Sequence, residues 1–546
     1  MQPHLLPLLS DLFGGGHLRD ELRRGFASGK TKPIAYRKEQ LARLAYMVQE
    51  NRDAFHEAMT SDLGRGTLEN DFMDFQPALG EITDAYNNVE KWSKPQKPAF
   101  NINWFAMNPE IRKEPKGTVL IISPFNFPMV LILGPLAGAL AAGCTALIKP
   151  SEQAPATAAV YARLVPQYLD PDACRVVLGA VPETTKLLEL QWDQILYTGS
   201  ARVAKIVLAA AAKHLTPVVT ELGGKNPVIV DPKMDLTLAA RRIAWGKFSN
   251  SGQICVSPDY VIVTEEIKEK FIKELLAVYA TFYPDGPRHS DSFSRMATKN
   301  HAARMQRLLA ETKGKIVIGG ETEVEERYVA PTIVKDVEWD DALMEDELFA
   351  PVMPIVVVKD VDEAIARVNS REHALALYIF SNDASYRKKV LDNTQSGTVV
   401  VNDVVIQYAA YDMPFGGVGG SGTGASTGRY GYEAFTHFRT TVVGKGWLDS
   451  IILKNRFPPY TDAKLKALGL MTSVRLPPKP KSLLAKGTKT NGWGTFLSRL
   501  GLSRLTTLLW YLLPVLAGYW VDHLPLIVQF YPGLQSFTDG HLDQFD

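Results

Sequence analysis

The feature that most constrains the fold of this chain is an alternation of short apolar runs with helical stretches, which begins at Gly117. Residues 118–122 (TVLII) and 145–148 (TALI) are two such runs. Strands that alternate with helices predict a doubly wound α/β sheet. The pattern starts again after residue 225, so we predict two α/β domains that meet near residue 220. The other runs expected to form strands are residues 175–178, 194–197, 217–220, 227–230, 260–263, 315–318 and 354–358.

The segment before Gly117 has a different pattern. Leu41, Leu44 and Met47 recur at helical spacing, so we expect residues 35–95 to form helices. A chain of 546 residues is long enough for two or three domains, each with its own core. Linker positions are expected at residues 115–117 and 477–480.

Charge and cysteine content limit the partners and the compartment. A formal net charge of +1 gives no general attraction to nucleic acid, so no nucleic-acid partner is expected. Three cysteines, Cys144, Cys174 and Cys255, are a sparse and odd set that does not form a disulfide framework, which indicates a reducing compartment. The first residues lack an early basic region and carry Asp11, so they are a poor signal peptide. No metal site is expected.

The C-terminal part of the chain differs from its body. Residues 454–504 contain eleven lysines and arginines against the single acid Asp462, a net charge of +10. Residues 505–521 (LTTLLWYLLPVLAGYWV) are 17 uncharged residues, at the lower limit of what spans a bilayer. Aromatic residues in this run suit the membrane interface, and basic residues lie only on its N-terminal side. We predict membrane association through this tail. The alternative is an amphipathic or core-docking helix, and Pro514 argues against a straight span.

Two short motifs point to chemistry. Cys255 ends the sequence NSGQIC, and a turn before a cysteine can expose its sulfur. A nucleophilic thiolate needs a lowered pKa, usually from backbone N–H groups or a helix N-terminus. Glu221 opens the sequence ELGGKNP at the end of an expected strand, where a carboxylate is placed for proton transfer. Taken alone, an isolated cysteine is more often a buried structural residue and a glutamate a solvated one.

The two motifs together resemble the aldehyde dehydrogenase superfamily. Cys255 follows Glu221 by 34 residues, and four further motifs stand in the order of that family. The resemblance covers about residues 35–445. It implies the aldehyde dehydrogenase fold, with a Rossmann-like NAD-binding domain, a second α/β catalytic domain and a small oligomerisation arm. The further motifs are SPFNFP at 123–128, LIKPSE at 147–152, EDELFAPV at 345–352 and MPFGGVGGSG at 413–422.

The resemblance also implies the division of the chain into domains. The predicted parts are a discontinuous NAD-binding domain at residues 1–99 and 112–219, a bridging or oligomerisation arm at 100–111 and 400–445, a catalytic domain at 220–399, a basic linker at 446–504 and an apolar membrane-associated tail at 505–546.

Three residues match the catalytic positions of the family. Cys255 matches the nucleophile and Glu221 the general base. Asn126 matches the asparagine whose amide stabilises the oxyanion together with the backbone N–H of Cys255. In the mechanism that this resemblance implies, the thiolate attacks the aldehyde carbonyl, hydride passes to the nicotinamide, and water activated by the base hydrolyses the thioester.

The cofactor is expected to be NAD, with NADP possible. Lys149 and Glu152 match residues that contact the adenosine ribose, and a carboxylate there would repel the 2′-phosphate of NADP. Gly199 and Ser200 precede the helical stretch 201–213, whose N-terminus can hold a pyrophosphate. The other residues expected at the cofactor are Val203, Leu222, Glu347 and Phe349, the last two at the nicotinamide ribose and ring.

The early position of Asn126 and the long C-terminal extension resemble the class-3 branch, which is dimeric and includes fatty aldehyde dehydrogenases. We therefore expect a homodimer that oxidises medium- or long-chain fatty aldehydes to acids. Its catalytic body should face the cytosol from the endoplasmic reticulum, a lipid droplet or the mitochondrial outer membrane. An apocarotenal or aromatic aldehyde is an alternative substrate. A non-catalytic structural relative and a CoA-acylating relative are alternatives of other classes, and the presence of Cys255 and Glu221 argues against both.

Overall fold

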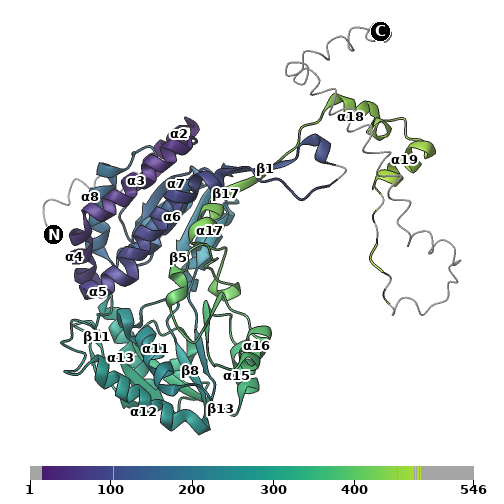
Figure 1. Ribbon diagram of the computed structural model, residues 1–546. Helices are drawn as coiled ribbons and strands as arrows, with labels where there is room; N and C mark the ends of the chain where they lie inside the picture. Colours follow the sequence, from purple (N-terminus) through teal and green to yellow (C-terminus); the bar gives the residue numbers. More distant parts are fainter. Residues whose placement is uncertain are drawn as a thin grey trace, which may run out of the picture. The chain divides into compact units, whose positions relative to one another are not determined.

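Figure 1 shows the computed structural model of the chain, which describes residues 15–101, 104–451 and 453–472, with 474, 476–478 and 480. The chain divides into two compact units, residues 1–94 with 113–438 and residues 95–112 with 439–546. The first unit holds both large sheets. The predicted tail at 505–546 lies outside the described residues. In the part of the chain that the structure describes, no helix is both long enough and apolar enough to cross a membrane.

A six-stranded sheet organises one half of the first unit. Its strand order is β16-β6-β5-β2-β3-β4. The strands are parallel except for β16, which runs antiparallel to β6. The bounds are β2 (Thr118–Ile122), β3 (Thr145–Lys149), β4 (Cys174–Val176), β5 (Gln194–Thr198), β6 (Val218–Glu221) and β16 (Gly422–Thr423).

Helices cover both faces of this sheet, and β2 is therefore buried along its whole length. Ile121 packs in the core formed with α7, whereas the neighbouring Leu120 packs on the other face in the core formed with α10. The helices of the first face are α3 (Ile34–Glu50), α4 (Arg52–Leu63), α6 (Gln76–Ser93), α7 (Val130–Ala142) and α8 (Pro155–Tyr168). Those of the second face are α2 (Gly15–Ala27), α9 (Val181–Glu189) and α10 (Ala201–Ala212).

A seven-stranded sheet organises the other half, in the order β15-β14-β7-β8-β13-β12-β9. Its strands are parallel except for β9, which is antiparallel to β12. The strands are β7 (Pro227–Val230), β8 (Tyr260–Thr264), β9 (Lys315–Ile318), β12 (Thr332–Lys335), β13 (Val352–Val358), β14 (Ala376–Phe380) and β15 (Thr398–Val401). Helices α11 (Leu236–Phe248) and α12 (Glu265–Phe282) pack on one face, and α13 (Lys299–Glu311), α14 (Ala342–Glu345), α15 (Val361–Asn369) and α16 (Ala384–Asn393) on the other.

Shorter elements lie outside the two large sheets. The short strands β10 (Thr322–Glu323) and β11 (Tyr328–Val329) pair with each other, as do β1 (Glu110–Pro115) and β17 (Thr436–Thr441). Helices α5 (Thr67–Asn70) and α17 (Gly428–Ala434) belong to the first unit, and α18 (Gly446–Ile451) and α19 (Asp462–Thr472) to the second.

The strand order of the first sheet fixes where a ligand can bind. The chain passes from β2 to β3 and β4 on one side and then returns to β5 on the other side of β2. In open α/β sheets, the binding crevice lies beyond the carboxyl ends of the two strands at which the order reverses. The loop at residues 123–129 after β2 and residues 199–200 after β5 lie at this edge.

The prediction of an α/β fold with two sheets is confirmed. All nine runs expected to be strands contain a strand, and the segment 35–95 is helical with breaks at Asn51, between α3 and α4, and at residues 64–66, between α4 and α5. The strands β12, β14 and β15 of the seven-stranded sheet were not predicted. The domain boundaries taken from the resemblance remain predictions.

Candidate active site

Glu221 is the last residue of β6, and backbone hydrogen bonds hold it on both sides. Its carbonyl oxygen accepts the N–H of Gly199 at 3.0 Å, and β16 places Gly422 opposite it. The following residue, Leu222, donates its N–H to the carbonyl of Ser421 at 3.0 Å. The glutamate side chain is only 5% exposed. The strand end therefore fixes a buried carboxylate at one position.

The loop that carries Cys255 has an unusual backbone. Asn250 and Ser251 have φ of 49° and 52°, and Gly252 has φ of 70°. Gly252 must be glycine, because a Cβ atom there would lie 2.2 Å from the carbonyl oxygen of Ala350. This turn directs the chain so that the Cys255 thiol, which is partly exposed, faces a pocket.

Asn226, in the motif that begins with Glu221, links the two catalytic segments. Its Nδ2 donates to the carbonyl oxygens of Cys255 at 2.8 Å and Ser257 at 2.9 Å. Its Oδ1 accepts the N–H of Ala376 at 2.9 Å. One buried amide thus holds the cysteine loop against the ELGGKNP segment and against β14. The spacing of the two motifs reflects a direct contact between them.

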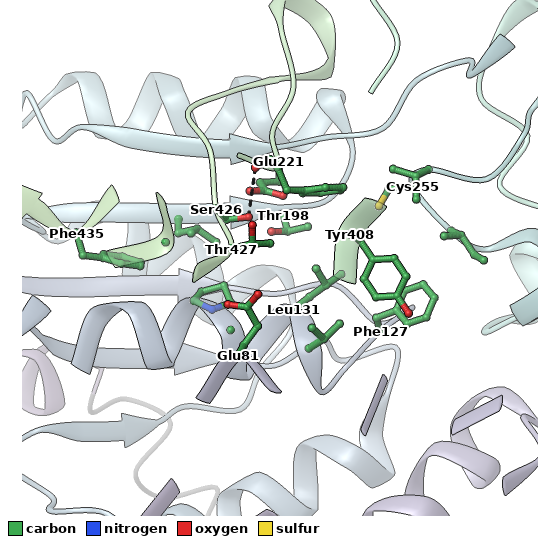
Figure 2. Close-up of a pocket in the computed structure, with 18 residues that line it drawn as sticks. Glu81, Phe127, Leu131, Thr198, Glu221, Cys255, Tyr408, Ser426, Thr427 and Phe435 are labelled. Atoms are coloured by element: carbon green, nitrogen blue, oxygen red, sulfur yellow. Dashed lines mark hydrogen bonds between the residues drawn. The ribbon is translucent and has the colours of Figure 1, made fainter. Parts of the chain in front are cut away.

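Cys255 and Glu221 line the same pocket, as Figure 2 shows. The space between the lining atoms is about 750 Å³, part of it open to solvent, and most of the lining is apolar. A concave apolar pocket with a few polar groups is typical of a small-molecule site. The other labelled lining residues are Glu81, Phe127, Leu131, Thr198, Tyr408, Ser426, Thr427 and Phe435.

The structure contradicts the expected lowering of the Cys255 pKa. Burial raises the pKa of this thiol to about 12, and the carboxylates of Glu347 and Glu221 raise it further, because a thiolate beside them would be repelled. The backbone N–H groups of Val256 and Cys255 lower the pKa, as the sequence suggested, but their effect is smaller. Cys255 is therefore a protonated thiol at neutral pH.

Burial also moves the two carboxylic acids toward neutral pH. It raises the pKa of Glu221 to about 7, with the hydroxyl of Ser426 opposing and the charge of Glu81 adding to the shift. The pKa of Glu347 is raised to about 8, mainly by burial and then by Asp259. A base with a pKa near 7 is half ionised at neutral pH and can both accept and release a proton.

Asn126 lies against the cysteine loop but not in the lining of the pocket. Its Nδ2 donates to the carbonyl oxygen of Gln253 at 3.0 Å, two residues before Cys255. An amide nitrogen carries two hydrogens, so one remains for an oxyanion. The backbone of Asn126 is itself fixed, because its carbonyl accepts Nδ2 of Asn250 at 3.0 Å and a guanidinium nitrogen of Arg65 at 3.4 Å.

A buried ion triad connects the chain segments that carry the site residues. Asp259 accepts hydrogen bonds from the ammonium groups of Lys225 at 2.6 Å and Lys247 at 3.4 Å, and from the N–H of Leu348 at 3.2 Å. The ammonium of Lys225 also donates to the carbonyl of Asp346 at 3.2 Å. The triad therefore connects the segments that carry Glu221, Cys255 and Glu347, and its charges keep the pKa of Asp259 below its usual value.

The residues expected at an adenosine group lie at the carboxyl end of β3, beside the crevice defined by the strand order. Lys149 is buried, and its ammonium donates to the Glu152 carboxylate at 2.8 Å. Ser200 is the N-cap of α10, because its hydroxyl accepts the N–H of Val203 at 3.4 Å. Gly199 has φ of 159° and leads directly into this helix. A helix N-terminus at this edge suits a pyrophosphate, so the residues present fit a dinucleotide.

The structure brings Glu347 close to the catalytic pair and Phe349 close to the loop of Asn126. A Cβ atom on Gly223 would lie 2.3 Å from a carboxylate oxygen of Glu347, so this side chain packs on the glycines that follow Glu221. Phe349 has φ of 52°, and its ring meets Phe125 edge to face at 5.9 Å. Glu347 is also close enough to raise the pKa of Cys255. Glu347 thus lies beside the catalytic pair, and Phe349 lies beside the residue that precedes Asn126.

Sequence reasoning missed several residues of the pocket. Glu81, on α6, belongs to no motif and lies far from the other site residues in the chain. Ser426 lies four residues after the motif MPFGGVGGSG at 413–422. Lys225 and Asn226 lie within the motif ELGGKNP, but the sequence assigned no role to them. Among the described residues, no group of three or more histidines, cysteines and acids could hold a metal ion.

Comparison with known proteins gives the family. The model of the aldehyde dehydrogenase family matches residues 20–441. The chain is 42% identical to aldehyde dehydrogenase family 3 member A2 of Mus musculus, over 81% of this chain and 91% of that protein. It is 40% identical to beta-apo-4′-carotenal oxygenase of Neurospora crassa, over 92% of this chain and 94% of that protein.

A solved structure supports the same conclusion. The substrate-bound AldH of Staphylococcus aureus is 36% identical, has a TM-score of 0.80 and covers 84% of this chain and 99% of that one. The match of the family model, the identity over most of the chain and the shared fold agree with the paired cysteine and glutamate in one pocket. The chain belongs to the aldehyde dehydrogenase family and is an oxidoreductase that acts on aldehydes with a nicotinamide cofactor.

Proposed function

We propose that Cys255 is the nucleophile of aldehyde oxidation, Glu221 the general base and Asn126 the oxyanion donor. The observation that carries this proposal is the shared pocket of Cys255 and Glu221, with the Glu221 pKa near 7. The Cys255 thiol gives up its proton to water as its sulfur attacks the aldehyde carbon, and the second N–H of the Asn126 amide, with the N–H of Cys255, stabilises the oxygen that becomes negative.

The remaining steps divide between cofactor and protein. The nicotinamide, when bound, supplies the acceptor for the hydride that leaves the aldehyde carbon. Glu221 then takes a proton from a water molecule, whose oxygen attacks the thioester carbon and releases the acid and the Cys255 sulfur. The same carboxylate argues against a CoA-acylating enzyme, which has no use for a base that activates water.

The proposed cofactor is NAD. The Glu152 carboxylate, 2.8 Å from the Lys149 ammonium, would lie near the hydroxyls of the adenosine ribose. A fixed negative charge there favours free hydroxyls over a 2′-phosphate. Titration of cofactor binding by fluorescence, with NAD and NADP in parallel and with Glu152→Gln, tests this. The substitution should reduce the difference in affinity between NAD and NADP.

The proposed substrates are medium- or long-chain aldehydes. The pocket beside Cys255 is lined by apolar side chains such as Phe127, Leu131 and Phe415, which bind an alkyl chain better than a short polar aldehyde. An apocarotenal aldehyde is the second candidate. It is favoured by the match to the Neurospora crassa carotenal oxygenase, which extends over 92% of this chain against 81% for the mouse relative.

A substrate panel separates these candidates. Aldehydes of 2 to 18 carbons, benzaldehyde and a long polyene aldehyde would be compared by kcat/KM, with NADH fluorescence as the signal. A kcat/KM that rises with alkyl chain length supports a fatty aldehyde, and a maximum at the polyene supports the apocarotenal. Absence of NADH formation with every aldehyde, while cofactor binds, would mean a non-catalytic relative.

We further propose that the protein is a homodimer held on a membrane by its C-terminal part, with the catalytic body in the cytosol. The sequence of the tail and the resemblance to the class-3 branch support this. In the described part of the second unit, Phe457, Tyr460 and Leu465 are 45%, 76% and 71% exposed and alternate with lysines and an arginine. Exposed apolar side chains among basic ones suit an anionic lipid surface. Cell fractionation and light scattering of the detergent-solubilised protein test the two proposals.

A further inference from the structure

The pocket contains a second buried carboxylate that the proposed mechanism does not use. Glu81 lies on the wall across from Glu221, with Thr198, Ser426 and Thr427 between them, as Figure 2 shows. Its Oε2 accepts the N–H of Gly428 at 2.9 Å, and the side chain is 6% exposed. Oε1 of Glu81 and Oε1 of Glu221 are buried without a hydrogen-bond partner among the described residues.

A third carboxylate continues the row toward the surface. Asp84 lies one turn further along α6, and its Oδ1 accepts Nδ2 of Asn88 at 2.9 Å. Its Oδ2 is also buried, and no partner for it is seen in the described structure. A Cβ atom on Gly428 would lie 3.2 Å from this Oδ2 and 3.1 Å from the backbone nitrogen of Asp412. Gly428 therefore contacts Glu81, Asp84 and the exposed Asp412 segment at once.

The charges of these groups act on one another in the same order. The charge of Glu81 raises the pKa of Glu221, that of Asp84 raises the pKa of Glu81, and that of Asp412 raises the pKa of Asp84. Burial is the largest cause at each of the three, and the pKa of Glu81 reaches about 7, equal to that of Glu221. Carboxyl groups with matched pKa values exchange a proton at little free-energy cost.

Other charged and titratable groups around the row are few. Tyr411 packs its hydroxyl against Gly80, next to Glu81, and is 43% exposed. Lys91 on α6 lowers the pKa of Asp84, and Arg429 on α17 lies 3.8 Å from Asp412. Helix α7 contributes only apolar groups such as Gly134 to the environment of Glu81. No cation neutralises Glu81 within this described region, so it is not one half of a structural ion pair.

Three neighbouring acids each have a buried oxygen without a hydrogen-bond partner among the described residues, and such oxygens destabilise a fold in which they serve only packing. We propose that Glu81 and Asp84 form a proton path that carries the proton accepted by Glu221 from the pocket to the surface at Asp412. This inference rests on the proposed role of Glu221 as the base.

Hydrolysis of the thioester releases the proton that this path carries. The water oxygen forms a bond to the thioester carbon while its proton moves to Glu221. The carbon–sulfur bond breaks, and its electron pair returns to the Cys255 sulfur. Glu221 passes the proton, across the Ser426 hydroxyl or a water molecule, to Glu81, which passes it to Asp84 and to solvent. Glu221 is then ionised again for the next turnover.

The test substitutes Glu81 by glutamine, whose amide oxygen can still accept the Gly428 N–H. We expect steady-state turnover to fall about tenfold, with an unchanged first burst of one NADH per site and little change in KM. Because Glu81 raises the pKa of Glu221, its neutralisation should also move the rise of turnover with pH to lower pH. A small weak base such as imidazole, at rising concentration, should restore turnover. Glu90→Gln, at an exposed glutamate of the same helix, is the matched control and should change none of these.

Glu81→Asp and Asp84→Asn complete the series. The aspartate variant should recover part of the rate, because it keeps a titratable group, and Asp84→Asn should reduce turnover less than Glu81→Gln. If Glu81→Gln turns over like wild type at every pH, or if its loss is insensitive to imidazole and appears in KM alone, the path does not exist. A failure of the proposed function looks different: Glu221→Gln would then leave wild-type turnover unchanged.

Discussion

Replacement of Glu221 by glutamine separates the two halves of the reaction. Glutamine has the same shape, and its amide oxygen can keep the hydrogen bond from the Ser426 hydroxyl, so the buried position remains filled. It cannot take a proton from water. Because hydride transfer precedes hydrolysis of the thioester, we expect the variant to form one NADH per active site and then stop at the acyl enzyme.

The size of the effect follows from the protonation of Glu221. With a pKa of about 7, most of the wild-type residue is carboxylate at pH 8, and its fraction falls tenfold for each pH unit below 7. Removal of a positioned general base lowers the rate of a proton-transfer step by about 10² to 10⁴. Steady-state turnover should therefore drop by at least about 10², and the residual rate should lose the wild-type rise near pH 7.

Stopped-flow NADH fluorescence measures both quantities in one trace. The expected result is a burst amplitude near one per site followed by a slow steady state, while Glu266→Gln, at an exposed glutamate of α12, behaves like wild type. If burst amplitude and steady-state rate decrease by the same factor, Glu221 acts before hydride transfer, for example in removing the Cys255 proton. Full steady-state turnover would refute its role as base.

The same variant changes stability in a defined direction. The folded-state pKa of Glu221 is raised from 4.5 to about 7, so its contribution to stability is fully present below pH 4.5 and is lost as pH rises through 7. Glutamine has no such pH-dependent loss. The free energy of unfolding of the variant minus that of wild type should therefore increase between low pH and a pH above 7. The increase should be at most roughly 3 kcal/mol. Chemical denaturation at pH 5 and pH 8.5 measures the difference.

Three further predictions concern the nucleophile, its support and the tail. Cys255→Ser should abolish aldehyde oxidation but keep cofactor binding, which fluorescence titration checks, and more than about a tenth of the wild-type rate would contradict the covalent mechanism. Asp259→Asn leaves the fully buried Lys247 without its anionic partner and should lower the free energy of unfolding by about 3–5 kcal/mol, measured by denaturation. Removal of residues from Lys479 onward should release the protein from membranes, as measured by salt and carbonate fractionation, and should leave propanal oxidation intact. Total loss of activity would mean that the tail packs on the catalytic body.

The sequence was sufficient where local pattern and function coincide. Strand β6 and the turn before Cys255 could be located because ELGGKNP and NSGQIC are short, contiguous segments. Glu81 could not be found from the sequence. Its position across from Glu221 depends on how α6 packs against α7 and α17, and α17 lies far from both other helices in the chain. Its own surroundings in the chain (LGEIT) are those of an ordinary amphipathic helix, in which a glutamate is usually exposed.

The error about Cys255 has a related cause. The sequence indicated backbone N–H groups near the sulfur, and the structure contains them, but it gave no view of the two carboxylates that burial places beside the thiol. Those carboxylates oppose ionisation of the thiol, because their charges repel a thiolate beside them. Glu221→Gln removes one of these charges and should therefore lower the pKa of Cys255. The thiol of the variant should then ionise more readily than that of wild type, in keeping with an NADH burst that survives the loss of the base.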